Sequence, residues 1–159
     1  MTVREHVGRR AVARLPLLAA LIAAAFALPV SPAHAAGGTS DVVAMVNAER
    51  ESAGCSPVSV DDRLAAAAQG HSRYQAEIDE MTHEGADGSS TGDRATDAGY
   101  RWSSIAENIA YGTTSAERVM EMWMGSSGHR ANIVNCKFRH IGVAQVDGHW
   151  TQVFGKPRG

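Results

Sequence analysis

Lysine is scarce in this chain of 159 residues, which contains only Lys137 and Lys156. Nucleic-acid binding needs clustered Lys and Arg against the phosphates, yet the 15 basic residues are outnumbered by 17 acidic ones. The sequence therefore predicts no nucleic-acid partner. Aromatic residues are also few, at 6%, and no internal repeat divides the chain. We expect one ordinary domain built around one core.

Several short motifs that carry chemistry are missing too. The chain has no phosphate-binding glycine loop, no dinucleotide-binding fingerprint, no C-x-x-C pair and no H-E-x-x-H zinc motif. These absences argue against nucleotide-dependent enzymes, dithiol oxidoreductases and metalloproteases that bind zinc through one helix.

Long apolar runs are absent except near the start, where Leu15–Leu28 forms a stretch too short to span a bilayer. Four arginines precede this stretch, and Ala33-His34-Ala35 follows it as an A-x-A cleavage site. The sequence predicts a signal peptide over residues 1–35 and a single exported domain over residues 36–159, without a membrane span. The adjacent Arg9 and Arg10 leave the twin-arginine route open beside the favoured general secretory route.

Without residues 1–35, which carry four Arg and one Glu, the chain has 11 basic and 16 acidic residues and a formal charge of −5. We expect an acidic surface, and the short length fits a monomer. Only Cys55 and Cys136 remain in a chain expected to meet an oxidising compartment. We expect them to form one disulfide, and the alternative is two separate buried thiols.

Helical spacing and capping residues predict three long helices. The first begins at Thr39 or Ser40 and ends near Gly54, and the second begins at Asp61 or Asp62 and ends near Met81. The third begins at a capping box of Thr114 and Glu117 and ends near Gly125. Residues 82–96 form a loop of a length that is usually functional or mobile, with a short helical turn within 92–99. We interpret residues 126–133 as a tight polar turn.

A hairpin is predicted at the end of the chain, where Asp147-Gly148 separates residues 139–146 from a second strand. Alternation along this second strand places His149, Thr151 and Val153 on one face and the residues between them on the other. Helices combined with a terminal hairpin indicate an α+β domain in layers.

Five histidines follow residue 35, and any one of them alone is more often structural than functional. We interpret His71, in mid-helix, and His140, early in a strand, as structural. His83, His129 and His149 each lie where a loop meets a regular element, which is where sites gather.

Glu107 is the carboxylate candidate, because it lies among small apolar residues. It is either partly buried and paired, or a strand residue pointing outward. Two histidines with one carboxylate would suit zinc with an open coordination position, with Glu107 as general base.

Six segments resemble, in order, the bacterial branch of the CAP superfamily, which comprises the cysteine-rich secretory, antigen 5 and pathogenesis-related proteins and whose domain is also called SCP. They are Val46-Asn47-Ala48-Glu49-Arg50, Leu64-Ala65-Ala66-Ala67-Ala68, His83 with Asp87-Gly88, Ala106-Glu107-Asn108-Ile109-Ala110, Trp123 to Ile133, and Trp150-Thr151-Gln152-Val153-Phe154. The resemblance covers about residues 41–155.

The resemblance implies a three-layer α-β-α sandwich with a central, mainly antiparallel sheet and a large open cleft. It implies that the cleft holds two His and two Glu, and that the two His bind zinc or another divalent cation. Carried over by motif, the metal ligands are His83 and His149, and the first Glu is Glu107. The second Glu is replaced by Ser126.

Other residues of the matching segments are expected to line the cleft. They are His129, which can fill the space of the missing Glu, together with Ser126, Asn108 and Gln152.

Three functions compete. The first is a secreted binding module, without turnover, for a lipid, another small ligand or a cell-surface partner. The second is a zinc-dependent, peptidase-like hydrolase that uses His83, His149 and Glu107. The third is an envelope protein with a vestigial cleft.

Overall fold

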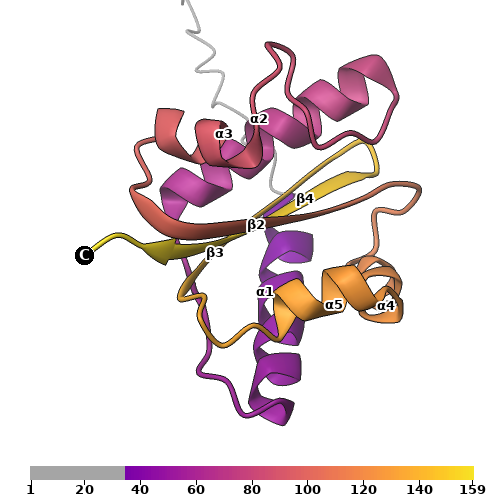
Figure 1. The fold of residues 1–159 in the computed structure, drawn as a ribbon. Helices are drawn as coiled ribbons and strands as arrows, with labels where there is room; N and C mark the ends of the chain where they lie inside the picture. The colour runs from indigo at the N-terminus through magenta and orange to yellow at the C-terminus, as the bar shows by residue number, and fades with distance from the viewer. Residues whose placement is uncertain (1–34) are drawn as a thin grey trace, which may run out of the picture. The chain divides into compact units, whose positions relative to one another are not determined.

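The computed structural model describes residues 35–159; nearly all of the predicted signal peptide lies outside this part. The described chain forms three layers (Figure 1). Helices α2 (Asp62–Ile78) and α3 (Thr91–Asp97) cover one face of a sheet, and α1 (Ala35–Ser52), α4 (Ala116–Gly125) and α5 (Ser127–Ile133) cover the other. The predicted α+β class and α-β-α sandwich are confirmed. Within residues 35–159, no helix is long and apolar enough to cross a membrane.

The sheet has four strands in the order β1-β3-β4-β2. They are β1 (Ser59–Val60), β2 (Trp102–Ala110), β3 (His140–Val146) and β4 (His149–Pro157). The short β1 runs parallel to β3, and the other two pairings are antiparallel. Strand β2 is therefore a sheet edge, which places its residues within reach of the loops on either side.

The predicted hairpin joins β3 to β4. Asp147 and Gly148 have φ values of 46° and 83°. Positive φ at both central positions is the type I′ geometry that Asp-Gly favours, because it matches the twist of the flanking strands. Register pairs Val146 with His149 across this turn, so His149 opens β4 as expected.

Helix starts were predicted less accurately than helix positions. Asp61 caps α2 as expected, by accepting a hydrogen bond from the Arg63 backbone. Helix α1 begins at Ala35, so Thr39 and Ser40 lie inside it, because the small residues before them also adopt helical geometry. At α4 the N-cap is Ser115 and not Thr114. Three hydroxyl residues in succession all offer a cap there, and the local pattern does not choose among them.

The segment after α4 was predicted wrongly. Residues 127–133 form α5 and not a polar turn. Seven residues are too few for a clear helical period, so the sequence pattern missed this element. The short helical turn expected within residues 92–99 is confirmed as α3. Ser90 and Asp93 begin α3 with a reciprocal capping box.

Close packing holds the layers together. Trp123 of α4 and Trp150 of β4 meet edge to face, with ring centroids 6.4 Å apart, on the α1 side of the sheet. On the other side, α2 lies directly against β3 at Gly142, where a Cβ would collide with the backbone of Leu64. Helix α2 is therefore packed tightly on the sheet face that carries the site described below.

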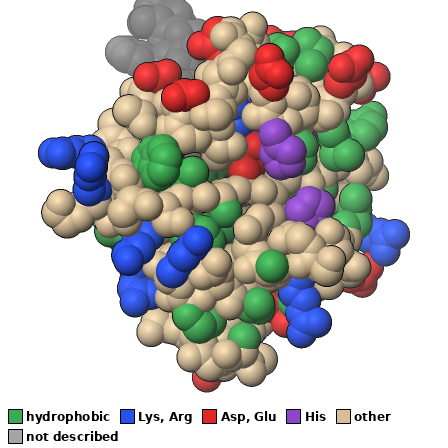
Figure 2. All heavy atoms as spheres, viewed as in Figure 1, with side chains coloured by type: hydrophobic (Ala, Val, Ile, Leu, Met, Phe, Trp, Pro, Cys, Tyr) green, Lys and Arg blue, Asp and Glu red, His purple; other side chains and the backbone are tan. Residues whose placement is uncertain are grey.

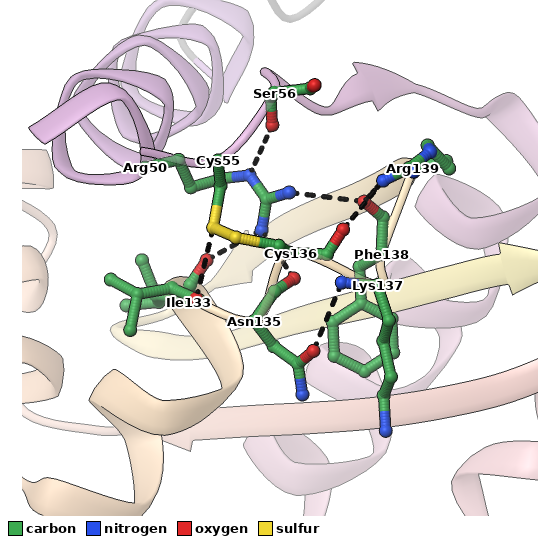
Figure 3. The surroundings of a disulfide bond; sticks show 10 residues. Arg50, Cys55, Ser56, Ile133, Asn135, Cys136, Lys137, Phe138 and Arg139 are labelled. Carbon is green, nitrogen blue, oxygen red and sulfur yellow. Dashed lines mark hydrogen bonds between the residues drawn. A yellow bond between two sulfur atoms is a disulfide. The ribbon is translucent and has the colours of Figure 1, made fainter. Parts of the chain in front are cut away.

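The predicted disulfide between Cys55 and Cys136 is present, and it joins residues 81 positions apart (Figure 3). Beside it lies Arg50, whose side chain is fully buried. Its guanidinium donates to four backbone carbonyls, those of Ser56, Ile133, Asn135 and Phe138. Arg50 thus ties α1 to the chain between α5 and β3, a role that sequence patterns did not indicate.

Candidate functional site

The site begins with the position of Glu107 on the edge strand β2. Glu107 pairs with Val153 of β4, so its side chain lies on the sheet face that α2 covers. Only 2% of that side chain is exposed. Of the two alternatives for Glu107, the partly buried and paired one is confirmed.

Three side chains surround this carboxylate, each from a different element. Arg94 of α3 donates through Nη2 to Oε2 at 2.7 Å, and His83 donates through Nδ1 to Oε1 at 2.8 Å. His71 of α2 lies further away, with Nε2 3.8 Å from Oε1. We call this set of Glu107, Arg94, His83 and His71 the Glu107 site.

Charge balance explains how a carboxylate is tolerated there. Burial acts to raise the pKa of Glu107, but the His83 hydrogen bond and the Arg94 charge outweigh it and hold that pKa below its usual range. The same hydrogen bond raises the pKa of His83. Burial lowers the pKa of His71 even though Glu107 acts against that shift. At neutral pH the site therefore contains an ionised Glu107 held by a charged Arg94, beside a His71 that stays neutral.

The loop between α2 and α3 is fastened to both helices. His71 donates through Nε2 to the Thr82 carbonyl at 2.6 Å, and Arg94 donates through Nη1 to the carbonyls of His83 and Ser89. Arg94 consequently binds Glu107 and the loop that carries His83 at the same time. We expected this loop to be functional or mobile, and the contacts hold it in place.

His83 is the accessible member of the site. Its side chain is 59% exposed, although Nδ1 is engaged with Glu107. This arrangement fixes the ring and leaves Nε2 as the atom available to a ligand. In Figure 2 two histidine side chains lie at the surface, one above the other, with acidic side-chain atoms beside the upper one.

His129 of α5 contacts strand β2 on the sheet face opposite Glu107. Burial lowers the pKa of His129, and the charge of His83 acts in the same direction. Its backbone carbonyl accepts a hydrogen bond from Asn108. Ser126, the residue that replaces the second Glu, separates α4 from α5 and makes no side-chain capping bond.

Asn108 and Gln152, also predicted as cleft residues, are fully buried on the opposite sheet face. Asn108 donates to Gln152 Oε1 at 2.9 Å and accepts from Asn132 at 2.8 Å. These contacts join β2, β4 and α5. The two amides therefore support the strand that carries Glu107, and they do not face the Glu107 site.

His149 lies apart from Glu107 along the same sheet face. It is four residues from Val153, the partner of Glu107, which corresponds to about 13 Å along β4. The residue is 2% exposed, its ring stacks on Tyr111 at 4.1 Å between centroids, and neither ring nitrogen has a hydrogen-bond partner among the described residues.

A shared cation site would therefore need two rearrangements. Tyr111 would have to uncover His149, and Glu107 would have to exchange Arg94 or His83 for the ion. Within residues 35–159, no group of three or more His, Cys, Asp or Glu side chains is arranged to hold a metal ion. The site of His83, His149 and Glu107 stays a prediction, and its donors do not fit an ion in this arrangement.

Two members of the site were missed by sequence reasoning. His71 was interpreted as structural, yet it shares the buried face of α2 with Leu64, Ala68 and Gln75, and that spacing signals contact with the sheet. Arg94 gave no signal, because α3 is short and its contact with Glu107 depends on the fold.

One motif has a structural role here. Gly88-Ser89-Ser90-Thr91-Gly92 matches the G-x-S-x-G pattern of serine hydrolases. Ser90, however, follows a loop and not a strand, and its hydroxyl donates to Asp93 and accepts from the Asp93 backbone. The hydroxyl is thus committed to capping α3 and is not arranged as a nucleophile.

The layered sheet, with a carboxylate on its edge strand bound by a histidine from the loop after α2, defines an SCP-like α-β-α sandwich. The chain belongs to the cysteine-rich secretory protein family, CAP, which it matches over residues 43–154.

Three bacterial proteins illustrate this relationship. The uncharacterized protein YkwD of Bacillus subtilis is 34% identical over 126 residues, which are 78% of this chain and 49% of YkwD. An extracellular SCP-domain protein of Bacillus anthracis has a crystal structure with a TM-score of 0.73 and 26% identity, covering 76% of this chain and 40% of its own. An outer surface protein of Borrelia burgdorferi shares the fold, with a TM-score of 0.71, 20% identity, and coverage of 77% and 95%. The chain thus spans half or less of the two Bacillus proteins.

Proposed function

We propose that the protein is an exported, non-enzymatic binding module in which His83, positioned by Glu107, binds a small anionic or hydrogen-bond-accepting ligand. One observation carries this proposal: both oxygens of the buried Glu107 carboxylate are engaged, by Arg94 and His83. The carboxylate therefore acts on His83 and has no direct access to a ligand.

This geometry argues against Glu107 as a general base. A general base must come within hydrogen-bond reach of the proton that it removes. The Glu107 side chain is 2% exposed, and its lowered pKa makes it a weak proton acceptor. Its contacts instead support a positioning role, because the Nδ1 hydrogen bond holds the His83 ring and stabilises its protonated form.

The ligand chemistry follows from the charges at His83. The raised pKa of His83 makes Nε2 a charged donor over a wider pH range, and Arg94 adds a positive charge behind it. A carboxylate or phosphate is the group that such donors bind most strongly. Binding should therefore be tighter below the pKa of His83 than above it.

Export is supported by three independent features. The Cys55–Cys136 disulfide persists best in an oxidising compartment. The leader pattern in residues 1–35 points the same way, and the Bacillus anthracis and Borrelia burgdorferi proteins are described as extracellular and as an outer surface protein.

The first test is a titration followed by NMR signals of the His83 ring. N-acetylalanine, a small carboxylate, should shift these signals in a saturable way, with tighter binding at pH 6 than at pH 8. N-acetylalanine amide should bind at least fivefold more weakly. In the variants, binding is followed by the backbone amide signals of residues 82–85. His83→Gln should abolish these shifts, and His140→Gln, which removes a histidine at the far end of the sheet, should not. No binding, or equal binding of the amide, would overturn the proposed ligand chemistry.

A cation-dependent hydrolase is the second candidate, supported by the two unpartnered ring nitrogens of His149. The donors do not fit an ion as they lie, so this candidate requires Tyr111 to uncover His149 and Glu107 to release Arg94 or His83. Two results together would favour this hydrolase over the binding module. Zinc binding would be lost in both His83→Ala and His149→Ala, and peptide or ester hydrolysis would be lost in Glu107→Gln.

Two further alternatives, a lipid-binding module and an envelope protein, need their own probes. A titration with monopalmitoylglycerol, a lipid without a carboxylate or phosphate, tests a lipid ligand. Under our proposal it should leave the His83 signals unchanged. An envelope protein with a vestigial cleft would bind none of the probes.

A further inference from the structure

Basic side chains gather at one end of the sheet, away from the Glu107 site. Although the chain has more acidic than basic residues, Arg101, Lys156 and Arg158 all lie where β2 begins and β4 ends. Figure 2 shows Lys and Arg side chains grouped on that side, whereas acidic side chains group over α2 and the loop after it. A basic surface of this kind favours an anionic partner.

A pocket of about 560 Å³ opens within this basic end, which is a volume typical of small-molecule sites. Its lining consists of Thr96, Arg101, Trp102, Ser103 and Arg158, with no acidic residue. The Arg158 backbone donates to the Arg101 carbonyl at 2.9 Å, so the residue before β2 and the residue after β4 are joined at the pocket.

The two arginines have no partners to neutralise them. Among residues 35–159, neither guanidinium makes an ion pair or a side-chain hydrogen bond. By contrast, Arg50, Arg63, Arg94 and Arg118 each bind a carboxylate or backbone carbonyls. Two free guanidinium groups at one pocket can bind one phosphate or carboxylate through several hydrogen bonds.

Trp102 gives the pocket a fixed aromatic wall. Its Nε1 donates to the Gly92 carbonyl and to Thr96 Oγ1, both at 3.1 Å. The ring lies so close to Gly92 that a Cβ there would come within 2.7 Å of it. Glycine at this position therefore allows the ring to rest against α3, and the anchored ring offers a flat apolar surface to the pocket.

A β-bulge lies in β2 beside the pocket. The register between β2 and β4 shifts between Trp102 and Ser104, which leaves Ser103 as the extra residue. The Ser103 hydroxyl donates to the carbonyls of Lys156 and Pro157 and fixes the bulge. Bulges of this kind often occur beside sites, where they redirect side chains. The Ser103 oxygen keeps its lone pairs for a donor such as a sugar hydroxyl.

We infer that this pocket binds an anionic saccharide, with Trp102 against the apolar face of the sugar ring and Arg101 and Arg158 on its phosphate or carboxylate. The flat wall, the two unpaired cations and the hydroxyl acceptor match the three chemical features of such a ligand. The inference does not depend on the function proposed for the Glu107 site.

The test follows the indole N–H signal of Trp102, which Trp102→Phe assigns among the three tryptophans. Glucose 6-phosphate, a sugar phosphate, should shift this signal in a saturable way. Glucuronate tests whether a sugar carboxylate binds as well, and it should shift the same signal. Neutral glucose should bind at least tenfold more weakly. If inorganic phosphate or adenosine monophosphate binds as tightly as glucose 6-phosphate and glucuronate, the inference is overturned, because the pocket would then not select a saccharide.

Two matched variants complete the experiment. Arg101→Gln with Arg158→Gln should weaken glucose 6-phosphate binding at least tenfold, whereas Arg73→Gln with Arg118→Gln removes the same charge from α2 and α4 and should change it less than twofold. Equal effects of the two double variants would show that only net charge matters and would overturn the site. Circular dichroism checks that each variant folds.

Discussion

Removing the Arg94 side chain tests how the buried carboxylate of Glu107 is held. Arg94→Met takes the guanidinium at 2.7 Å away from Glu107, whose side chain is 2% exposed in the wild type. Breaking a buried ion pair by removing one partner costs about 3–5 kcal/mol. We expect the lower end, about 3 kcal/mol at pH 7, because His83 still binds Glu107 and the Arg94 side chain is itself 12% exposed.

The loss should depend on pH in a defined direction. In the wild type the pKa of Glu107 is lowered, so its stabilising contribution is present above the unfolded pKa and is lost as pH falls. In Arg94→Met, burial would raise that pKa, and Glu107 would take up a proton as the solution becomes acidic. The difference in unfolding free energy between the two proteins should therefore be smaller at pH 4.5 than at pH 7.

Urea denaturation of the two proteins at both pH values measures this difference. The control is Arg118→Met, which removes an exposed arginine paired with Glu121, with side chains 64% and 65% exposed. It should change the unfolding free energy by less than about 0.5 kcal/mol. If Arg94→Met is as mild as this control at pH 7, or if its effect grows as pH falls, the description of the Glu107 site is wrong.

Three further predictions concern the fold. Reduction of Cys55–Cys136, which closes a loop of 81 residues, should lower the unfolding free energy by about 4 kcal/mol in denaturant titrations, and a change below about 1 kcal/mol would contradict a stabilising bridge. Gly142→Ala should lower the melting temperature strongly or prevent folding. The control Gly70→Ala, in open space on α2, should raise the unfolding free energy by about 0.5–1 kcal/mol. Similar behaviour of the two variants would refute the close approach at Gly142. Arg50→Met leaves four carbonyls without their donor and should cost at least about 3 kcal/mol by urea denaturation, and a neutral result would show that water replaces the guanidinium.

Features decided by neighbouring residues were predictable from the sequence. The Asp147-Gly148 turn and the Asp61 cap follow from local backbone chemistry, and the alternation in β4 assigned its faces correctly. The disulfide followed from two cysteines in a chain expected to be exported. In each case a few residues carry the whole physical reason.

Features decided by tertiary contacts were not predictable in the same way. His83 and Glu107 were recognised as candidates, but their hydrogen bond joins residues 24 positions apart and depends on how the loop after α2 folds back. Arg94 contacts Glu107 only because α3 lies beside β2, and no period or motif marks it. The Tyr111 stack over His149 likewise arises from the pairing of β2 with β4.

The pKa of His83, measured by NMR titration in the wild type and in Glu107→Gln, tests the central claim most directly. If Glu107 positions His83 and stabilises its charged form, the wild-type pKa lies above the ordinary value of about 6.5, and it falls below that value in Glu107→Gln, where burial and Arg94 act unopposed. A wild-type pKa at or below 6.5 that Glu107→Gln leaves unchanged would contradict the account.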